Sequence, residues 1–271
     1  MAITSYLYQI LISLKKKELI SSGKTNSILE IGEQNWYGDV SFQDLKKAID
    51  NYSDSKNKEI LHRKLNEITT LTELGKDPKI FAFDVAKLFY KAVFDYKEYL
   101  ALDLQGTKHS INFDLNNEYK DVKKYDVVTN IGTSEHIFNQ LAVFKTIHNS
   151  VTAGGLIIHQ LPGQGYYEGY YDHGFYNYQP TFFFDLAEAN NYFMVGFWMY
   201  DNNKRQLINV HNRENYVKLF VRENHPTYYD NIVIYKSPSE KKEEFKLPTQ
   251  HIYSKTNISS EEKKRWDANK K

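Results

Sequence analysis

The 271-residue sequence contains no cysteine and no apolar run that approaches the ~20 residues of a membrane span. The absence of cysteine excludes disulfides, thiolate nucleophiles and thiolate metal sites, and it suits a reducing compartment. The 35 Lys and Arg residues balance 34 Asp and Glu residues, so the net charge is +1 and there is no global field to hold a nucleic acid or an anionic bilayer. Near the N-terminus the basic run Lys15–Lys17 follows apolar residues, the reverse of a secretory signal. We therefore expect a cytoplasmic protein with no nucleic-acid or membrane partner.

The sequence is rich in aromatic residues, with 22 Tyr and 16 Phe. Hydrophobic residues make up 41% and charged residues 25%, and the mean hydropathy is -0.62, which describes a globular chain and excludes a wholly disordered or fibrous one. A chain of this length can bury a sizeable core. We expect one domain over residues 1–238, followed by a charged, peripheral tail over residues 239–271.

Strand-like and helix-like segments alternate along the domain. Short apolar runs that end in polar or glycine residues predict strands, and apolar residues at helical spacing predict helices. The alternation predicts an α/β fold with a Rossmann-like, doubly wound, mostly parallel sheet, a helical insertion and antiparallel closing strands. The expected strands cover residues 27–32, 99–103, 110–113, 125–132, 156–160, 193–200, 216–221 and 231–235, and the expected helices cover 4–21, 138–150, 182–191 and two or three segments within 41–98.

The informative polar residues follow the predicted strands. Glu30 and Gly32 close the first strand, Asp103 closes the second, Asp114 follows the third, and the fourth runs into the segment 130–136. In an open parallel sheet, ligands bind beyond the carboxyl ends of the strands. These residues are therefore expected to meet at one ligand site.

An acid at the end of the second strand indicates the kind of ligand. An ionised carboxylate accepts two or more hydrogen bonds, so Asp103 can take both hydroxyls of a ribose. A nucleoside base would then lie between Leu104 and Leu115, with Asp114 accepting from an exocyclic amine. The pattern predicts a nucleoside-containing ligand.

Over residues 25–162 the chain resembles the class I S-adenosylmethionine-dependent methyltransferases, through ILEIG, ALDL, NFDL, YDVVTNIGTSEHI and GGLIIHQLP. The segments HGFYNYQPTFFFDLAEANNY and FKLPTQHIY also resemble a bacterial group associated with the modification of surface glycans and small metabolites. The resemblance implies S-adenosyl-L-methionine as methyl donor, S-adenosyl-L-homocysteine as product, and a small-molecule or glycan-related acceptor.

The same resemblance implies roles for residues at the strand ends. Glu30 and Gly32 would border the methionine and the sulfonium, Asp103 would hold the ribose, and Asp114 the adenine. Asn130 and Gly132 would line the floor of the site. The full expected cofactor set is Glu30, Gly32, Gln34, Asp103, Leu104, Asp114, Leu115, Asn130, Gly132 and Glu135.

Two features depart from the family pattern. The family's loop after the first strand usually carries three alternate glycines, whereas Glu33–Tyr37 follows Gly32 here and the next glycine is Gly38. The ribose-binding acid also comes much later in this chain than is usual. Residues 41–98 are therefore interpreted as an inserted helical cap that shapes the acceptor pocket.

Methyl transfer to a hydroxyl needs a base, and histidine titrates nearest neutrality. The candidates are His136, His159 and His173, each on or after the carboxyl end of a predicted strand. His173 ranks first because the loop over residues 163–181 should overhang the methyl group, and Asp172 or Glu168 could orient its ring.

The loop over residues 163–181 is rich in tyrosine. Phenol rings can stack on a sugar or heterocycle and form hydrogen bonds through their hydroxyls. Packing in the core or at an interface between copies in a homo-oligomer explains such a cluster equally well. The residues expected to bind the acceptor are Tyr167, Tyr171, Tyr176 and Tyr178.

Alternative functions make different sequence demands. A methyltransferase for base amines in nucleic acids needs an Asn/Asp-Pro-Pro-aromatic segment after the fourth strand, and Asn130-Ile131-Gly132-Thr133 lacks it. A nicotinamide enzyme needs Gly-x-Gly-x-x-Gly after the first strand, which is also missing. A non-catalytic scaffold on the same fold stays open because of the altered glycine loop. A Glu-His pair with Asp172 offers ligands for a divalent metal, but no tight ligand spacing supports one, so none is predicted.

Overall fold

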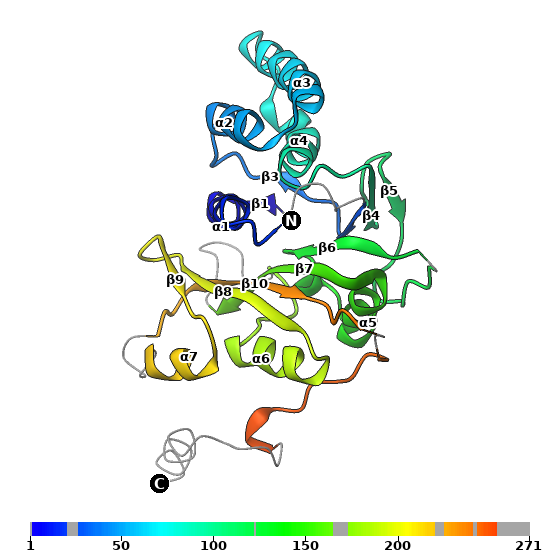
Figure 1. Cartoon of the computed structure of the whole chain (residues 1–271), viewed down its shortest axis with the longest axis vertical. Helices are drawn as coiled ribbons and strands as arrows, with labels where there is room; N and C mark the ends of the chain where they lie inside the picture. Colours follow the sequence, from blue (N-terminus) through cyan, green and yellow to red (C-terminus); the bar gives the residue numbers. More distant parts are fainter. Residues whose placement is uncertain are drawn as a thin grey trace.

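The computed structural model describes residues 2–20, 27–121, 123–164, 173–219, 225–240 and 243–253. Their centre is an eight-stranded sheet with the order β5-β4-β2-β6-β7-β10-β8-β9 (Figure 1). The first five strands in this order pair in parallel, whereas β10 is antiparallel to both of its neighbours and β9 is antiparallel to β8. The predicted α/β class with antiparallel closing strands is confirmed. The strands are β2 (Ser27–Ile31), β4 (Glu98–Asp103), β5 (Ser110–Asn112), β6 (Tyr125–Ile131), β7 (Val151–Gln164), β8 (Phe193–Asp201), β9 (Gln206–Asn209) and β10 (Tyr229–Lys236).

Helices cover both faces of the sheet (Figure 1). Successive residues of a strand point to opposite faces, so Ile28 joins one buried cluster and Leu29 the other. The first cluster includes residues of α1 (Ser5–Lys16) and α4 (Ala82–Phe94), and the second includes residues of α5 (Gln140–Ser150) and α6 (Pro180–Ala189). Because the central strands are covered on both faces, they read in the sequence as unbroken apolar runs.

The helical region over residues 41–98 has two parts. Figure 1 shows α2 (Phe42–Tyr52) and α3 (Ser55–Glu73) standing away from the sheet, with α4 between them and the strands. A short 3-10 turn, η1 (Pro78–Phe81), leads into α4. Phe89 and Phe94 of α4 are fully buried in the core. The region therefore combines the crossover helix from β2 to β4 with a projecting pair of helices.

A small second sheet fixes the loop that follows β2. It pairs β1 (Ala2–Ile3) in parallel with β3 (Asn35–Trp36), and the Tyr37 amide also donates to the Ile3 carbonyl at 3.1 Å. The Trp36 indole then donates to the Val40 carbonyl at 3.1 Å. The segment that replaces the expected run of glycines is thus held by backbone pairing and a buried indole.

The strand predicted over residues 216–221 is wrong, because residues 216–219 lie in α7 (Arg213–Leu219) and the remaining two fall outside the described residues. The Asn212 side chain accepts from the Asn215 amide at 2.9 Å, which starts a helix. Tyr216 then packs against Phe184 of α6, and β9 takes the place beside β8. The first helix was also predicted too long, since α1 ends at Lys16 and Glu18 adopts φ 58°.

Part of the charged C-terminal segment packs against the domain. The Lys246 amide donates to the Asn190 side chain at 2.9 Å, and the Asn190 side chain donates back to the Lys246 carbonyl at 3.0 Å. The tail from residue 254 onward lies outside the described residues. Across the described parts of the chain, none of the helices combines the length and apolar character needed to cross a lipid bilayer.

Candidate functional site

A pocket of about 420 Å³ lies at the carboxyl ends of β2, β4 and β5, as the strand topology predicted. Asp103 lies on its wall together with Gly32 and Thr133, and the apolar part of the lining includes Leu104, Phe113 and Leu115. Gly32 adopts φ 75°, a left-handed conformation that favours glycine, so its backbone can turn closely against the pocket. We refer to this space as the donor pocket.

The residues of the donor pocket fit an adenosyl group. The Asp103 carboxylate accepts from the Glu33 amide at 2.9 Å through one oxygen and from the Gln105 amide at 2.8 Å through the other. Each carboxylate oxygen can accept a further hydrogen bond, so both retain capacity for a ribose hydroxyl. The exposed Leu104 and the buried Leu115 offer apolar surface to a base.

Glu33 braces this pocket, a role that the sequence reasoning missed. Its carboxylate pairs with Lys87 of α4 at 2.6 Å and accepts from the Thr107 amide at 2.6 Å and the Thr107 hydroxyl at 2.8 Å. Burial alone would raise the pKa of Glu33, but these partners outweigh it and hold the pKa below its usual range. The sequence signal was Lys87, a lone cation among the buried residues Val85–Phe89 of α4.

Glu30 and Gln34 lie beneath the pocket and hold the loop after β2. One Glu30 oxygen accepts from the Gln34 amide at 2.9 Å and from the Tyr99 hydroxyl. The Gln34 side chain is fully buried and bonds with the Gly32 carbonyl, the Tyr90 hydroxyl and the Thr129 hydroxyl. Burial raises the pKa of Glu30 to about 8. These two expected cofactor residues are therefore placed to support the loop from below.

Asp114 is turned toward its own turn, where one oxygen accepts from the Asn116 amide and the Asn116 side chain, both at 2.9 Å. Asn130 also acts on the backbone of the site. Its side chain accepts from the Ser134 amide at 3.2 Å and donates to the Ser134 hydroxyl at 3.0 Å. Asn130 thereby fixes the turn over residues 132–136, which follows β6.

A second pocket of about 730 Å³ lies on the other side of that turn. Gly132, Glu135 and His173 line it, whereas Thr133 and His136 of the same turn line the donor pocket. Its wall is rich in hydrogen-bonding side chains from the N-terminal segment, the loop after β3, the strands β7 and β10 and the turn between β8 and β9. These include Thr4, Tyr6, Asp39, Gln160, Asn202, Arg205 and Asp230. We refer to this space as the acceptor pocket.

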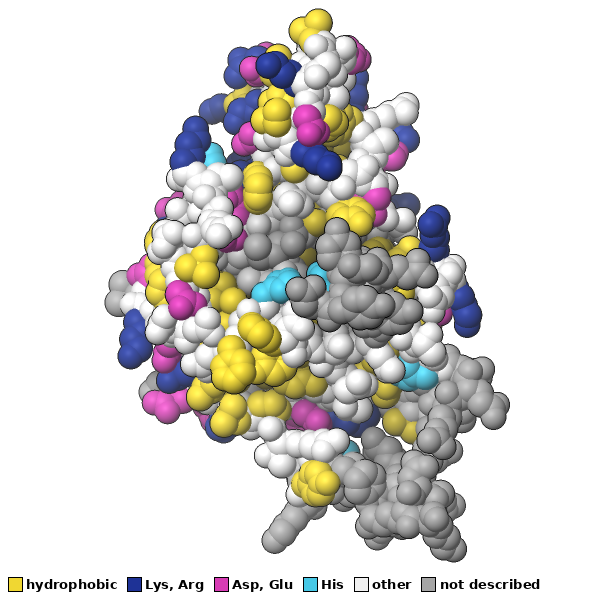
Figure 2. Space-filling view, turned by 180° about the vertical axis from the view of Figure 1, so that it is seen from behind, with side chains coloured by type: hydrophobic (Ala, Val, Ile, Leu, Met, Phe, Trp, Pro, Cys, Tyr) yellow, Lys and Arg dark blue, Asp and Glu magenta, His cyan; other side chains and the backbone are white. Residues whose placement is uncertain are grey.

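Glu135, His136 and His173 come together where the two pockets meet. The Glu135 carboxylate lies 3.8 Å from His136 Nε2 and 4.0 Å from His173 Nε2, and the two imidazole rings are 5.2 Å apart between centroids. Figure 2 shows that histidine side chains reach the surface near the middle of one face, with hydrophobic side chains close by. Glu135 itself is only 1% exposed, so it lies at the bottom of this group.

Burial shifts the protonation of the cluster toward neutral forms. It raises the pKa of Glu135 to about 7. Burial and the neighbouring His173 together lower the pKa of His136. A carboxyl with a pKa near neutral pH beside an imidazole whose neutral form is favoured suits a site where a proton is taken up.

The third candidate base, His159, lies inside the core. It is 1% exposed, its Nδ1 contacts the Asn130 amide group at 3.2 Å, and aromatic rings of Phe144, Phe183 and Tyr235 surround it. Burial lowers the pKa of His159 to about 3, so it stays neutral. This environment is typical of a structural histidine.

Of the four tyrosines expected to bind the acceptor, Tyr167 and Tyr171 lie outside the described residues. Tyr178 is buried, and its hydroxyl donates to the Gln140 side-chain oxygen at 2.6 Å and bonds with the Ser134 hydroxyl at 2.9 Å. The Tyr176 hydroxyl donates to the Phe138 carbonyl at 2.9 Å. Both described tyrosines therefore support the turn after β6 from behind.

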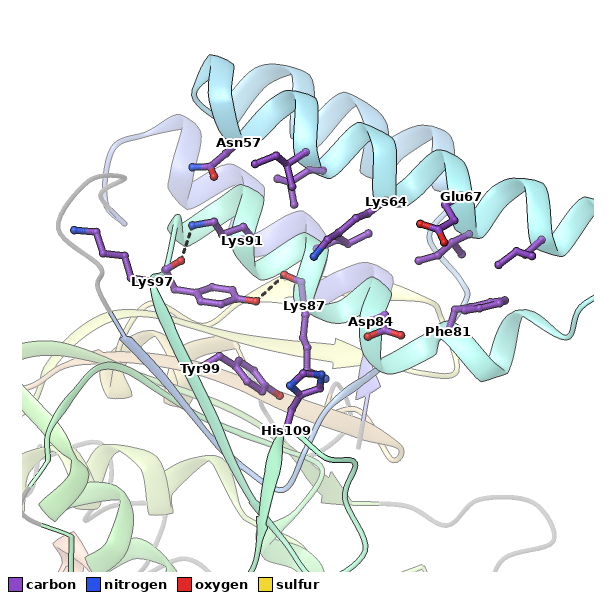
Figure 3. Close-up of a pocket in the computed structure, with 16 residues that line it drawn as sticks. Asn57, Lys64, Glu67, Phe81, Asp84, Lys87, Lys91, Lys97, Tyr99 and His109 are labelled. Atoms are coloured by element: carbon purple, nitrogen blue, oxygen red, sulfur yellow. Dashed lines mark hydrogen bonds between the residues drawn. The ribbon is translucent and has the colours of Figure 1, made fainter.

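A further cavity, of about 760 Å³, lies between α3 and α4 near the start of β4 (Figure 3). Acidic and basic side chains both line this cavity, so its lining indicates no single class of ligand. Lys87 sits 5.0 Å from the centre of the Tyr99 ring, and Tyr99 in turn bonds with Glu30. The wall of this cavity thus also supports the donor pocket. Its charged lining residues are Lys64, Glu67, Asp84, Lys87, Lys91 and Lys97.

No protein-family model matches the chain, and no curated protein matches it in sequence. Solved structures similar to it include the N-methyltransferase NodS from Bradyrhizobium japonicum, at 10% identity over 85% of this chain and 94% of that chain, with a TM-score of 0.40. The O-methyltransferase of a trans-AT PKS multienzyme of Brevibacillus brevis, in complex with S-adenosyl-L-homocysteine, is 11% identical over 85% of this chain and 72% of that chain, with a TM-score of 0.41. The YcgJ protein from Bacillus subtilis is 8% identical over 86% of this chain and 100% of that chain, with a TM-score of 0.44. At this level of similarity, the functional assignment depends on the pocket residues of this chain.

Proposed function

We propose that this protein is an S-adenosylmethionine-dependent methyltransferase that methylates a hydroxyl group of a small-molecule or glycan-related acceptor. The observation that carries the proposal is the placement of Asp103 in the donor pocket. A carboxylate with free acceptor capacity lies at the end of β4, beside apolar side chains for a base and the Gly32 turn. This is the set of contacts that an adenosyl group requires.

In the proposed reaction, one pocket binds the methyl donor and the other binds the acceptor. S-adenosylmethionine supplies a methyl group on a sulfonium, which is already activated toward a nucleophile. The protein must align the acceptor oxygen with that methyl and remove the hydroxyl proton. The turn over residues 132–136 borders both pockets, and Glu135, His136 and His173 gather at it. We assign the activation of the acceptor hydroxyl to this cluster.

The lining of the acceptor pocket favours a hydroxylated molecule. Gln160 already bonds with Thr4 and Tyr6, and Asn202 with Asp230, but each amide keeps a second N–H and a carbonyl lone pair. Arg205 donates and the second Asp230 oxygen accepts, so several hydroxyl groups can be held at once. Tyr6 and Tyr200 stack with ring centroids 4.1 Å apart and add a flat apolar wall. Such a combination suits a sugar-like acceptor better than an apolar one, and an amine acceptor is the alternative.

Calorimetric titration with S-adenosylmethionine tests the donor site. We expect saturable binding to the wild-type protein and loss of about tenfold or more in affinity in Asp103→Asn, because the amide replaces one acceptor oxygen by a donor. The control is Glu59→Gln, which removes an acid from an exposed position of α3. Equal affinity of the wild type and Asp103→Asn would contradict the assignment of the donor pocket.

A further inference from the structure

We propose that Glu135, His136 and His173 bind a divalent transition-metal ion at the junction of the donor and acceptor pockets. One ligand atom from each of the three side chains lies within 4.8 Å of the other two. Two imidazole nitrogens and a carboxylate oxygen form a mixed ligand set that suits ions such as Zn²⁺, Co²⁺, Fe²⁺ or Mn²⁺. The sequence had predicted no metal because His173 is far along the chain from Glu135 and His136 and comes from a different loop.

The distances fit a site that closes slightly on an ion. Ligands about 2.1 Å from a tetrahedral ion lie about 3.4 Å from one another. The Glu135 oxygen is 3.8 Å from His136 Nε2 and 4.0 Å from His173 Nε2. Both separations exceed a hydrogen bond, so neither histidine satisfies this oxygen directly. Small rotations of the exposed imidazoles would bring the three ligands to metal-binding distances.

The burial and the incomplete hydrogen bonding of Glu135 favour a cation bound beside it. Its side chain is buried, and its Oε2 atom has no hydrogen-bond partner among the described residues. Buried carboxylate oxygens in folded proteins are nearly always hydrogen-bonded, and an exception calls for an explanation such as a bound ion. The oxygen that faces the two imidazoles is Oε1, so a divalent ion bound by both oxygens of the Glu135 carboxylate would supply the partner that Oε2 lacks.

The backbone holds the ligands in place from two sides. The Glu135 carbonyl accepts from the amides of Phe175 at 2.7 Å and Tyr176 at 3.2 Å, which ties the turn after β6 to the segment that carries His173. Gly174 lies so close that a Cβ atom there would be 3.0 Å from the Glu135 carbonyl oxygen and 3.1 Å from its Cγ. The absence of a side chain at position 174 thus permits the close approach of His173 to Glu135.

The position of the ion gives it a role in the proposed methyl transfer, on which this part of the inference rests. Three protein ligands leave coordination positions open toward the two pockets. A bound ion would make the acceptor hydroxyl more acidic, so that its O–H bond would break with the proton passing to water. The acceptor oxygen would then form a bond to the methyl carbon while the carbon–sulfur bond of S-adenosylmethionine breaks, with S-adenosyl-L-homocysteine as the leaving group. Expansion of the ion from four to five ligands when the acceptor binds would favour acceptors whose hydroxyl has a second oxygen on the adjacent carbon, because both oxygens can then bind the ion.

Cobalt(II) is the probe for the site, because its visible absorption reports the ligand set. We expect the untagged, chelator-treated full chain to bind one Co²⁺ ion in calorimetry and to develop an absorption band. Glu135→Gln and His173→Ala should each weaken binding by about 100-fold or more, a larger loss than most outer-shell changes cause. Cooperative urea unfolding of these variants would show that they are folded.

The second carboxylate-histidine group of the described chain provides the control. Asp185, Glu188 and His251 also place ligand atoms within 4.8 Å of one another, but Asp185 already pairs with Arg213. Glu188→Gln should leave the Co²⁺ affinity and spectrum unchanged, and so should Asp103→Asn, which tests the donor site alone. Absence of Co²⁺ binding, binding that survives Glu135→Gln and His173→Ala, or binding lost in Glu188→Gln would each overturn the proposal. A wild-type protein that binds Co²⁺ but does not bind S-adenosylmethionine would contradict only the methyltransferase assignment.

Discussion

The buried carboxyl of Glu30 should make the stability of this protein fall as the pH rises. Burial raises the pKa of Glu30 from 4.5 to about 8, so the folded protein holds a proton that the unfolded chain has released between these two values. Stability is therefore greatest below the unfolded pKa and decreases until the folded pKa is passed. At about 1.4 kcal/mol per pH unit, the whole change amounts to about 5 kcal/mol.

Replacing Glu30 by glutamine isolates this effect. The glutamine oxygen can still accept from the Gln34 amide and the Tyr99 hydroxyl, so Glu30→Gln keeps the contacts of the loop but cannot ionise. Glu135 has a raised pKa as well and steepens the decline in both proteins, so the difference between them reports Glu30 alone. The exposed Glu59 serves as control, since Glu59→Gln should follow the wild type at every pH.

The assay is urea unfolding, followed by tryptophan fluorescence, at intervals from about pH 5 to about pH 9. We expect the wild type and Glu30→Gln to unfold with similar free energies at the acidic end. The variant should then gain about 4 kcal/mol relative to the wild type by the alkaline end. Parallel curves for the two proteins across this range would refute the reasoning that Glu30 is neutral in the folded state.

Two further substitutions test the support of the donor pocket and the packing of the sheet. Lys87→Met leaves the buried Glu33 carboxylate without its cation, so we expect a loss of about 3 kcal/mol in urea unfolding and weaker S-adenosylmethionine binding in calorimetry, because the Glu33 amide holds Asp103. An unchanged affinity would show that this ion pair does not position Asp103. Gly163→Ala would place a Cβ atom 1.9 Å from the buried Tyr229 ring, so we expect a loss of about 3 kcal/mol in unfolding free energy, and a loss below about 1 kcal/mol would show that the ring yields.

The topology of the sheet explains why part of the site could be predicted from the sequence. Buried parallel strands appear as short apolar runs, and their carboxyl ends must share one edge of the sheet. For this reason Gly32, Asp103 and Leu115, which come from three different connections, could be assigned to one pocket from the sequence alone. The structure places all three on the wall of the donor pocket.

The direction of a side chain at a strand end could not be predicted in the same way. Gln34 points down toward Tyr90 and Thr129, and Asp114 bonds with Asn116 in its own turn. Short polar side chains often bond with nearby backbone groups, and the sequence does not reveal which hydrogen-bond partner such a side chain takes. His159 was a candidate because it lies near the end of a predicted strand, but both faces of β7 are covered there, since Ile158 and Gln160 are buried as well as His159.

Contacts between segments that are far apart in the sequence could not be predicted either. The Glu33 and Lys87 side chains come from distant parts of the connection between β2 and β4 and meet Thr107 of the next connection, and Glu135 and His173 meet across two connections. Each pair depends on how two loops pack against each other. Local patterns such as helical spacing carry no information on that packing. Lys87, a cation between the buried residues Ala86 and Leu88 of α4, was the one available sign of the first contact.

A crystal structure of the protein with S-adenosyl-L-homocysteine is the most direct test of the proposed donor pocket. We expect the ribose hydroxyls to bond with the Asp103 carboxylate and the base to pack against Leu104 and Leu115. The sulfur should face the turn over residues 132–136. An empty donor pocket at saturating ligand, or a ligand bound instead in the lysine-lined cavity between α3 and α4, would contradict it.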